Sequence, residues 1–124
     1  MSSQILLSGG DKWYSYSGMQ VGDVSVPASI QLMLIPNTGL RDSYLVIQPV
    51  YGKEVASASG SQLGIEVKLD DVTIIKSQNL TYAIYELGAF NLFVPRQSKL
   101  EIISINESAN NTQERGANVI GYYL

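Results

Sequence analysis

The chain has 124 residues, of which only 15% are charged, and its net charge is −3. This length allows one domain with one core. The absence of cysteine and histidine excludes a Ser-His-Asp triad, a thiol nucleophile and the usual zinc and copper sites. The eight basic residues are scattered from Lys12 to Arg115, so the sequence predicts no binding to nucleic acid through phosphates.

The predicted elements are short strands, because apolar and polar residues alternate and turn residues interrupt them at regular intervals. In chain order the predicted strands are 4–8, 12–17, 28–35, 43–51, 65–69, 72–76, 80–87, 89–94, 99–105 and 118–124, and glycines interrupt residues 19–25. The strand at 28–35 should place Ile30, Leu32 and Leu34 on one face. Pro49 cannot donate a ladder hydrogen bond, so its strand should be an edge or carry a bulge there.

The clearest element is a hairpin within residues 63–77. Ile65, Val67 and Leu69 alternate with Glu66 and Lys68 before a turn at Asp70-Asp71. This pattern is typical of two antiparallel strands with one buried face and one wet face.

The predicted fold is all-β, a single antiparallel β-sandwich over residues 1–124. A count of about eight to ten short strands favours a jelly roll. Residues 53–62 and 106–116 are predicted loops, and only 113–117 are compatible with a single helical turn. The chain shows no signal peptide and no apolar run long enough to span a membrane.

Carboxylates are the remaining candidates for catalysis, since two of them suffice for a glycosidase. Glu66, Asp70 and Glu101 are expected on outward faces, where charge is simply solvated. Asp70-Asp71 suits a turn and is too small a set of ligands for calcium. The others that we considered are Asp23, Asp71 and Glu86. We therefore predict no catalytic, cofactor or metal site.

Aromatic residues are the better functional candidates, because Trp and Tyr anchor protein interfaces. They form three clusters, at Trp13, Tyr14 and Tyr16, at Tyr82 and Tyr85, and at Tyr122 and Tyr123. The interface candidates are Trp13, Tyr14, Tyr16, Tyr122, Tyr123 and Leu124. Alternation separates Tyr14 and Tyr16 from Trp13, so these three do not form one platform.

Three segments resemble small virion proteins of tailed bacteriophages, of the capsid decoration and head or tail accessory type. They are Ile35-Pro36-Asn37-Thr38-Gly39-Leu40, the stretch from Leu92 to Ile102, and Asn118-Val119-Ile120-Gly121-Tyr122-Tyr123-Leu124. The resemblance implies a non-enzymatic protein in the virion, commonly a homotrimer, that braces capsid subunits. Its implied partners are copies of itself and a major capsid or other virion protein. The charge distribution and the short apolar runs predict no nucleic-acid partner and no membrane partner. The resemblance defines no binding residue.

The alternative is a carbohydrate- or receptor-binding β-sandwich module. Trp13, Tyr82 or Tyr85 would then stack on a sugar, because such rings combine an apolar face with a polar group. Residues 53–62 and 106–116 would shape the site, as loops on a rigid scaffold often do.

Overall fold

The computed structural model describes residues 5–9, 11–18, 20–21, 28–54, 63–78, 89–106 and 113–124. The predicted strand at 80–87, with Tyr82, Tyr85 and Glu86, lies outside these residues, as does Asp23. The described residues form ten strands and no helix, which confirms the all-β prediction. The strands are β1 (Ile5–Gly9), β2 (Lys12–Tyr16), β3 (Gln20–Val21), β4 (Ala28–Ile35), β5 (Ser43–Glu54), β6 (Leu63–Leu69), β7 (Val72–Gln78), β8 (Phe90–Val94), β9 (Leu100–Asn106) and β10 (Gln113–Tyr123).

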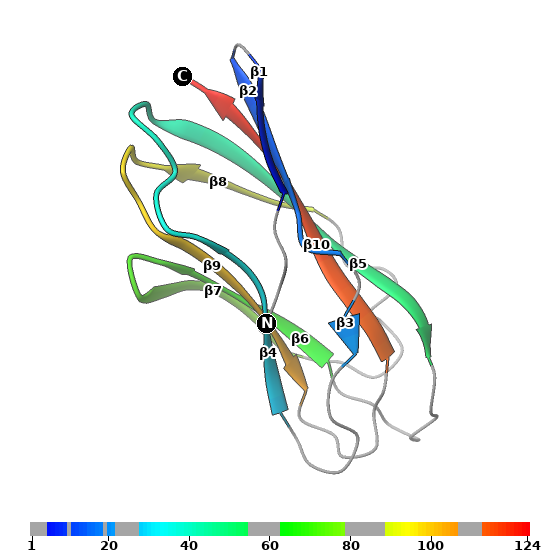
Figure 1. Ribbon diagram of the computed structural model, residues 1–124. Helices are drawn as coiled ribbons and strands as arrows, with labels where there is room; N and C mark the ends of the chain where they lie inside the picture. The colour runs from blue at the N-terminus through cyan, green and yellow to red at the C-terminus, as the bar shows by residue number, and fades with distance from the viewer. Residues whose placement is uncertain are drawn as a thin grey trace.

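The strands form two antiparallel sheets that face each other (Figure 1). Sheet A has the order β1-β2-β10-β5-β8, with β3 also paired to β10, and sheet B has the order β4-β9-β6-β7. The pairing is nested: β6 pairs with β7, β5 with β8, β4 with β9, and β2 with β10. An antiparallel ribbon rolled up in this way is a jelly roll, as predicted.

The hairpin of β6 and β7 has the predicted turn. Asp70 and Asp71 have φ angles of 50° and 69°, the left-handed values of a tight two-residue hairpin turn. Ile65 and Val67 are buried and Glu66 is half-buried, so the predicted faces of β6 are confirmed.

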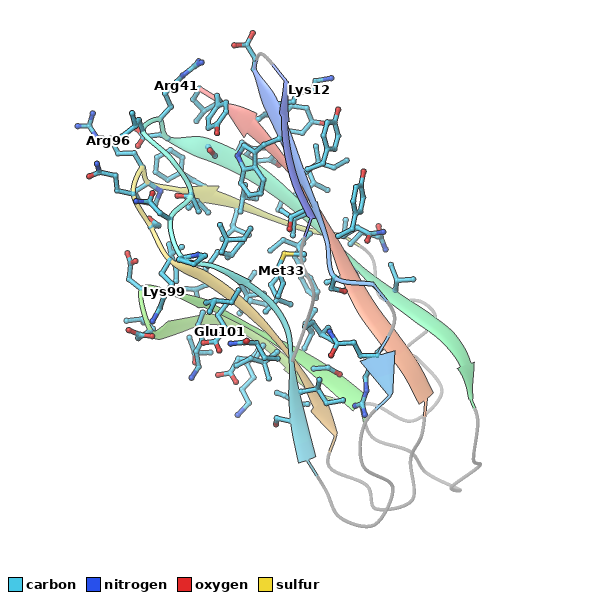
Figure 2. The ribbon with its side chains drawn as sticks, in the orientation of Figure 1. Lys12, Met33, Arg41, Arg96, Lys99 and Glu101 are labelled. Atoms are coloured by element: carbon cyan, nitrogen blue, oxygen red, sulfur yellow. The ribbon has the colours of Figure 1, made fainter. Side chains whose placement is uncertain are left out.

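Strand β4 departs from the predicted alternation. Its register against β9 shifts between Gln31 and Met33, which marks a β-bulge at Leu32. Leu32, Met33 and Ile35 are all buried, and Met33 lies between the two sheets (Figure 2). The prediction of one apolar face through Leu34 is therefore wrong, because the extra residue reverses the phase of the alternation.

Strand β10 begins five residues earlier than predicted. Residues 113–116 belong to the strand and pair with β5, so the predictions of a loop through 116 and of a helical turn at 113–117 are wrong. Arg115 is fully buried, and its Nη1 donates to the Ser104 hydroxyl at 3.3 Å. Pairing with β5 outweighs the polar composition that suggested a loop.

Pro49 costs no hydrogen bond to β10. The Leu124 N–H donates to the Asp42 carbonyl at 3.0 Å, just beyond the β10–β5 ladder. Because bonded pairs alternate in an antiparallel ladder, even-numbered residues of β5 direct their backbone groups to β10, and Pro49 faces the other side. Strand β5 is an interior strand, paired with both β10 and β8, and its register with β10 is regular at Pro49. The prediction of an edge strand or of a bulge at Pro49 is therefore wrong, and the proline is accommodated because its nitrogen faces away from β10.

The core between the sheets contains Trp13, which packs on β10. A side chain at Gly121 would overlap the Trp13 ring, so the close approach of ring and backbone requires glycine. Trp13 Nε1 donates to the Ser43 hydroxyl at 3.4 Å, which satisfies the indole in the core.

Candidate functional site

The outer face of sheet A carries a row of aromatic side chains. Tyr122 is directly opposite Tyr44, and Tyr44 is directly opposite Phe93. Residues in register on neighbouring strands share one face of the sheet, so the three rings follow one another across β10, β5 and β8. We call these three residues the aromatic row. Tyr44 is 40% exposed and Phe93 is 54% exposed.

Two further rows of the same face are also apolar or uncharged. The second row contains Tyr14, Ile120, Val46 and Asn91, and the third contains Tyr16, Asn118 and Gln48. We call the three rows together the aromatic face. Its members alternate along each strand with buried residues such as Leu45 and Val119, so the alternation that builds the core also directs these side chains outward.

The charged side chain of this face is Lys12, at the β2 end of the aromatic row. It is opposite Tyr122, and its Nζ lies 5.4 Å from the centre of the Tyr122 ring. A cation at this distance from an aromatic face is attracted by the ring quadrupole. Among the described side chains that β2, β5, β8 and β10 direct outward, none other is charged.

The outer face of sheet B is different. Lys68 is opposite Glu101, and Glu66 is opposite Lys76. Gln31 donates to Glu101 at 2.6 Å, and the Thr73 hydroxyl donates to Glu66. Lys12 and Glu101 lie on opposite sides of the sandwich in Figure 2. This face therefore combines paired charges with the partly exposed apolar side chains of Leu34 and Ile103.

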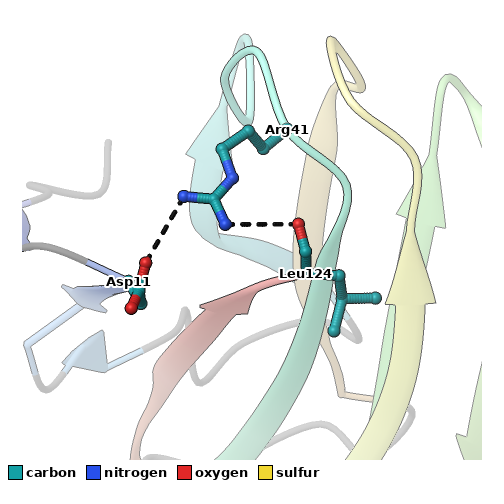
Figure 3. A network of polar contacts seen from close by, with 3 residues as sticks. All are labelled: Asp11, Arg41 and Leu124. Atoms are coloured by element: carbon teal, nitrogen blue, oxygen red, sulfur yellow. Dashed lines mark hydrogen bonds and ion pairs between the residues drawn. The ribbon is translucent and has the colours of Figure 1, made fainter.

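The last residues of the chain are held at one end of the sandwich. Arg41 lies between Asp11 and Leu124 (Figure 3). Its Nη1 is 3.4 Å from Asp11 Oδ1, its Nη2 donates to the Leu124 carbonyl at 3.2 Å, and its guanidinium is 5.2 Å from the centre of the Tyr123 ring. Leu124 remains 66% exposed. Tyr123 packs against the core, so these contacts fix the end of β10 beside the aromatic row.

The structure separates the predicted contact residues into two groups. Tyr14, Tyr16 and Tyr122 lie on the aromatic face, and Leu124 is exposed beside it. Trp13 is only 2% exposed, so its burial does not fit a role as a contact or as a sugar-stacking platform. The ring of Tyr123 faces inward at the end of the sandwich and packs against the core.

The predicted turn carboxylates have structural roles. Asp70 Oδ1 accepts from the Lys99 N–H at 2.8 Å, and Asp71 forms an ion pair with Lys99 Nζ. The hydrogen bond from Lys99 to Asp71 raises the pKa of that lysine. Within the described ranges, no group of three or more acidic side chains could hold a metal ion.

Sequence reasoning missed Tyr44 and Phe93, the most exposed members of the aromatic row. The signal was present in the alternation, because Leu45 and Ile47 on β5, and Leu92 and Val94 on β8, mark the inward positions. What the sequence could not supply was the pairing of β5 with β8 and β10, which brings Tyr44, Phe93 and Tyr122 into one row.

The fold is similar to that of a viral capsid protein. The chain matches the crystal structure of the infectious bursal disease virus VP2 subviral particle with a TM-score of 0.51 and 16% sequence identity. The match covers 99% of this chain but only 32% of that one. No family of known proteins and no curated sequence matches the chain. The described part of the chain has no helix with the length and hydropathy to cross a bilayer.

Proposed function

We propose that this chain is a non-enzymatic virion structural protein, of the type that decorates bacteriophage capsids, and that it binds other virion proteins through its aromatic face. The observation that carries the proposal is the aromatic row on a face where Lys12 is the charged group among described side chains. Interface centres are enriched in aromatic residues and poor in charge. The likeness to a capsid-protein fold supports the same reading.

Such a protein would act by linkage. A chain that binds only the assembled particle stabilises that particle over its free subunits. The rigid sheet suits this role, because Tyr44 and Tyr122 lie on strands paired on both sides and lose little freedom when they are buried. The resemblance to decoration proteins suggests a homotrimer that contacts the major capsid protein, with the virion as its location.

A matched pair of variants tests the proposal. Purified protein is mixed with particles of its virus that lack it, and bound protein is measured by co-sedimentation. Tyr44→Glu places a charge in the aromatic row, and Thr73→Glu places the same charge on the exposed outer face of sheet B. We expect Tyr44→Glu to weaken binding by more than about tenfold and Thr73→Glu to leave it unchanged. Equal binding by both variants, or no binding by the parent protein, would refute the proposal.

The carbohydrate- or receptor-binding alternative has one observation in its favour. The rings of Tyr16 and Tyr44 are each about 40% exposed, and an exposed ring can stack on a sugar. Calorimetry against a panel of glycans tests it. Binding of a glycan that Tyr44→Glu abolishes, without binding to particles, would favour this alternative.

A further inference from the structure

Lys12 is a cation on the aromatic face with which no described carboxylate pairs. It is exposed, and its Nζ lies 5.4 Å from the centre of the Tyr122 ring. Its register partner on β1 is Gly9, which has no side chain, and the next residue on the same face of β2 is Tyr14. Among the described residues Lys12 has no ion pair, so the Tyr122 ring is the described group that attracts its charge.

The carboxylate nearest to Lys12 in the sequence is directed to another cation. Asp11 Oδ1 is 3.4 Å from Arg41 Nη1 (Figure 3). Arg41 is held in this position by its bond to the Leu124 carbonyl and by the ring of Tyr123. In the part of the chain that the structure describes, the aromatic face therefore presents one positive charge on an otherwise uncharged surface.

The position of this ammonium group determines what a partner must provide. Because it lies over Tyr122, a partner that covers this end of the aromatic row also covers Lys12. Covering removes water from the ammonium, and a charge that loses water without gaining an opposite charge weakens binding strongly. A carboxylate of the partner would compensate for the lost water, and a charge pair of this kind also fixes how the two surfaces are aligned.

The described residues of this chain do not offer such a carboxylate to a second copy. Each of their carboxylate side chains already accepts a hydrogen bond or forms an ion pair within the chain, and none lies on the aromatic face. They are Asp11, Asp42, Glu66, Asp70, Asp71 and Glu101, and their partners are Arg41, the Arg96 N–H, Thr73, the Lys99 N–H, Lys99 Nζ and Gln31. Two copies that met through their aromatic faces would bring two Lys12 side chains to one interface, where like charges are unfavourable. A different chain is therefore the better partner.

We propose that Lys12 determines the specificity of the aromatic face by binding an Asp or Glu side chain of the partner virion protein. This inference rests on the proposed function and adds the chemistry of the partner, a carboxylate set beside apolar or aromatic groups. The apolar groups would cover Tyr122, Tyr44 and Phe93, and the carboxylate would lie at the β2 end of that row. A protein without an acidic group at this position would be rejected, because it would leave the ammonium covered and unpaired.

Two variants that each lose one positive charge test this inference by co-sedimentation with particles that lack the protein. Lys12→Gln removes the charge from the aromatic face, and Lys76→Gln removes it from the outer face of sheet B, so the two variants have the same net charge. We expect Lys12→Gln to bind at least about tenfold more weakly than the parent and Lys76→Gln to bind like the parent. Raising sodium chloride from about 0.1 M to about 1 M should weaken binding of the parent more than binding of Lys12→Gln.

Crosslinking identifies the group that Lys12 contacts. A carbodiimide activates a carboxylate, and a lysine amine in direct contact with it then forms an amide with release of a urea. Mass spectrometry of the parent protein bound to particles should show Lys12 joined to an Asp or Glu of another virion protein. Lys12→Arg, which keeps the charge but lacks the amine, is the control that should give no such crosslink.

The outcomes separate this inference from the proposed function. If the parent protein does not bind particles, both fail. If the parent binds and Tyr44→Glu weakens binding, the aromatic contact stands. The role of Lys12 is then wrong if Lys12→Gln binds as well as Lys76→Gln, or if Lys12 gives no crosslink to another virion protein. A crosslink from Lys12 only to a second copy of this chain also overturns it. Should Lys12→Gln fail to fold, the crosslink on the parent protein decides alone.

Discussion

Both sheets of this sandwich alternate inward and outward side chains, but the outward side chains differ in kind between the two sheets. On sheet B, alternation places Lys68 opposite Glu101. On sheet A, it places Tyr44 opposite Phe93. Cross-strand pairs of either type stabilise a sheet by similar small amounts, about 0.2–1 kcal/mol. Fold stability therefore does not explain why one face is aromatic, whereas the proposed contact with other virion proteins would.

The contrast also shows that a jelly-roll fold restricts the inward residues much more than the outward ones. The inward residues are determined by the core, which is closely packed and tolerates little change in volume. The outward residues are under no such constraint, so their character carries the information about function. We expect a face that contacts only solvent to carry charged pairs, as the outer face of sheet B does.

The largest effect is expected where the core directly supports the aromatic face. Gly121→Ala would force its new methyl group into the Trp13 ring and should destabilise the fold by about 1–3 kcal/mol or more. Asn118→Ala, on the outward side of the same strand, should change stability by no more than about 0.5 kcal/mol. Chemical denaturation measures both. Equal stability of the two variants would show that Trp13 does not pack on β10 as described.

A smaller effect on stability, with a large effect on binding, is expected when the aromatic pair is replaced by an ion pair. Tyr44→Lys combined with Phe93→Glu copies onto sheet A the type of pair found on sheet B. Stability should change by about 1 kcal/mol or less, while binding to particles should fall by more than about tenfold. The control inverts the pair on sheet B, with Lys68→Glu and Glu101→Lys, and should bind normally. A double variant of Tyr44 and Phe93 that still binds would contradict the distinction between the faces.

The smallest effect concerns Lys99, beside the hairpin turn of sheet B. The hydrogen bond to Asp71 raises the pKa of Lys99, and the neighbouring charges of Glu101 and Asp70 also favour the charged form. A lysine whose pKa is raised in the folded state stabilises the fold at a pH below the ordinary lysine pKa. This stabilisation is lost as the pH rises through the raised pKa. Asp71→Asn should lower the pKa of Lys99, measured by NMR titration above about pH 9. An unchanged pKa would show that the ion pair does not persist in solution.

Local patterns in the sequence predict the class of fold and its hairpin. The alternation from Ile65 to Leu69 and the Asp70-Asp71 turn are adjacent in the sequence, so together they predict the hairpin without knowledge of any other strand. The phase of β4 was not predictable, because a bulge at Leu32 depends on the partner strand. The start of β10 was missed for the same reason, since pairing with β5 makes a strand of residues that look like a loop.

The candidate site was predictable only in part. Tyr14 and Tyr16 could be assigned to one face, because alternation along a strand is a local property. The sequence predicts Trp13 as a contact residue, but Gly121, more than a hundred positions away in the chain, provides the space that buries it. The aromatic row needed strand order, which no local pattern contains.

The nesting of strands has a consequence for synthesis. Because β10 lies between β2 and β5, sheet A is split until Gln113–Tyr123 has emerged from the ribosome. The aromatic face therefore cannot form before β10 has been synthesised. Pairing between strands so distant in the chain is slow compared with the folding of helical proteins of the same size.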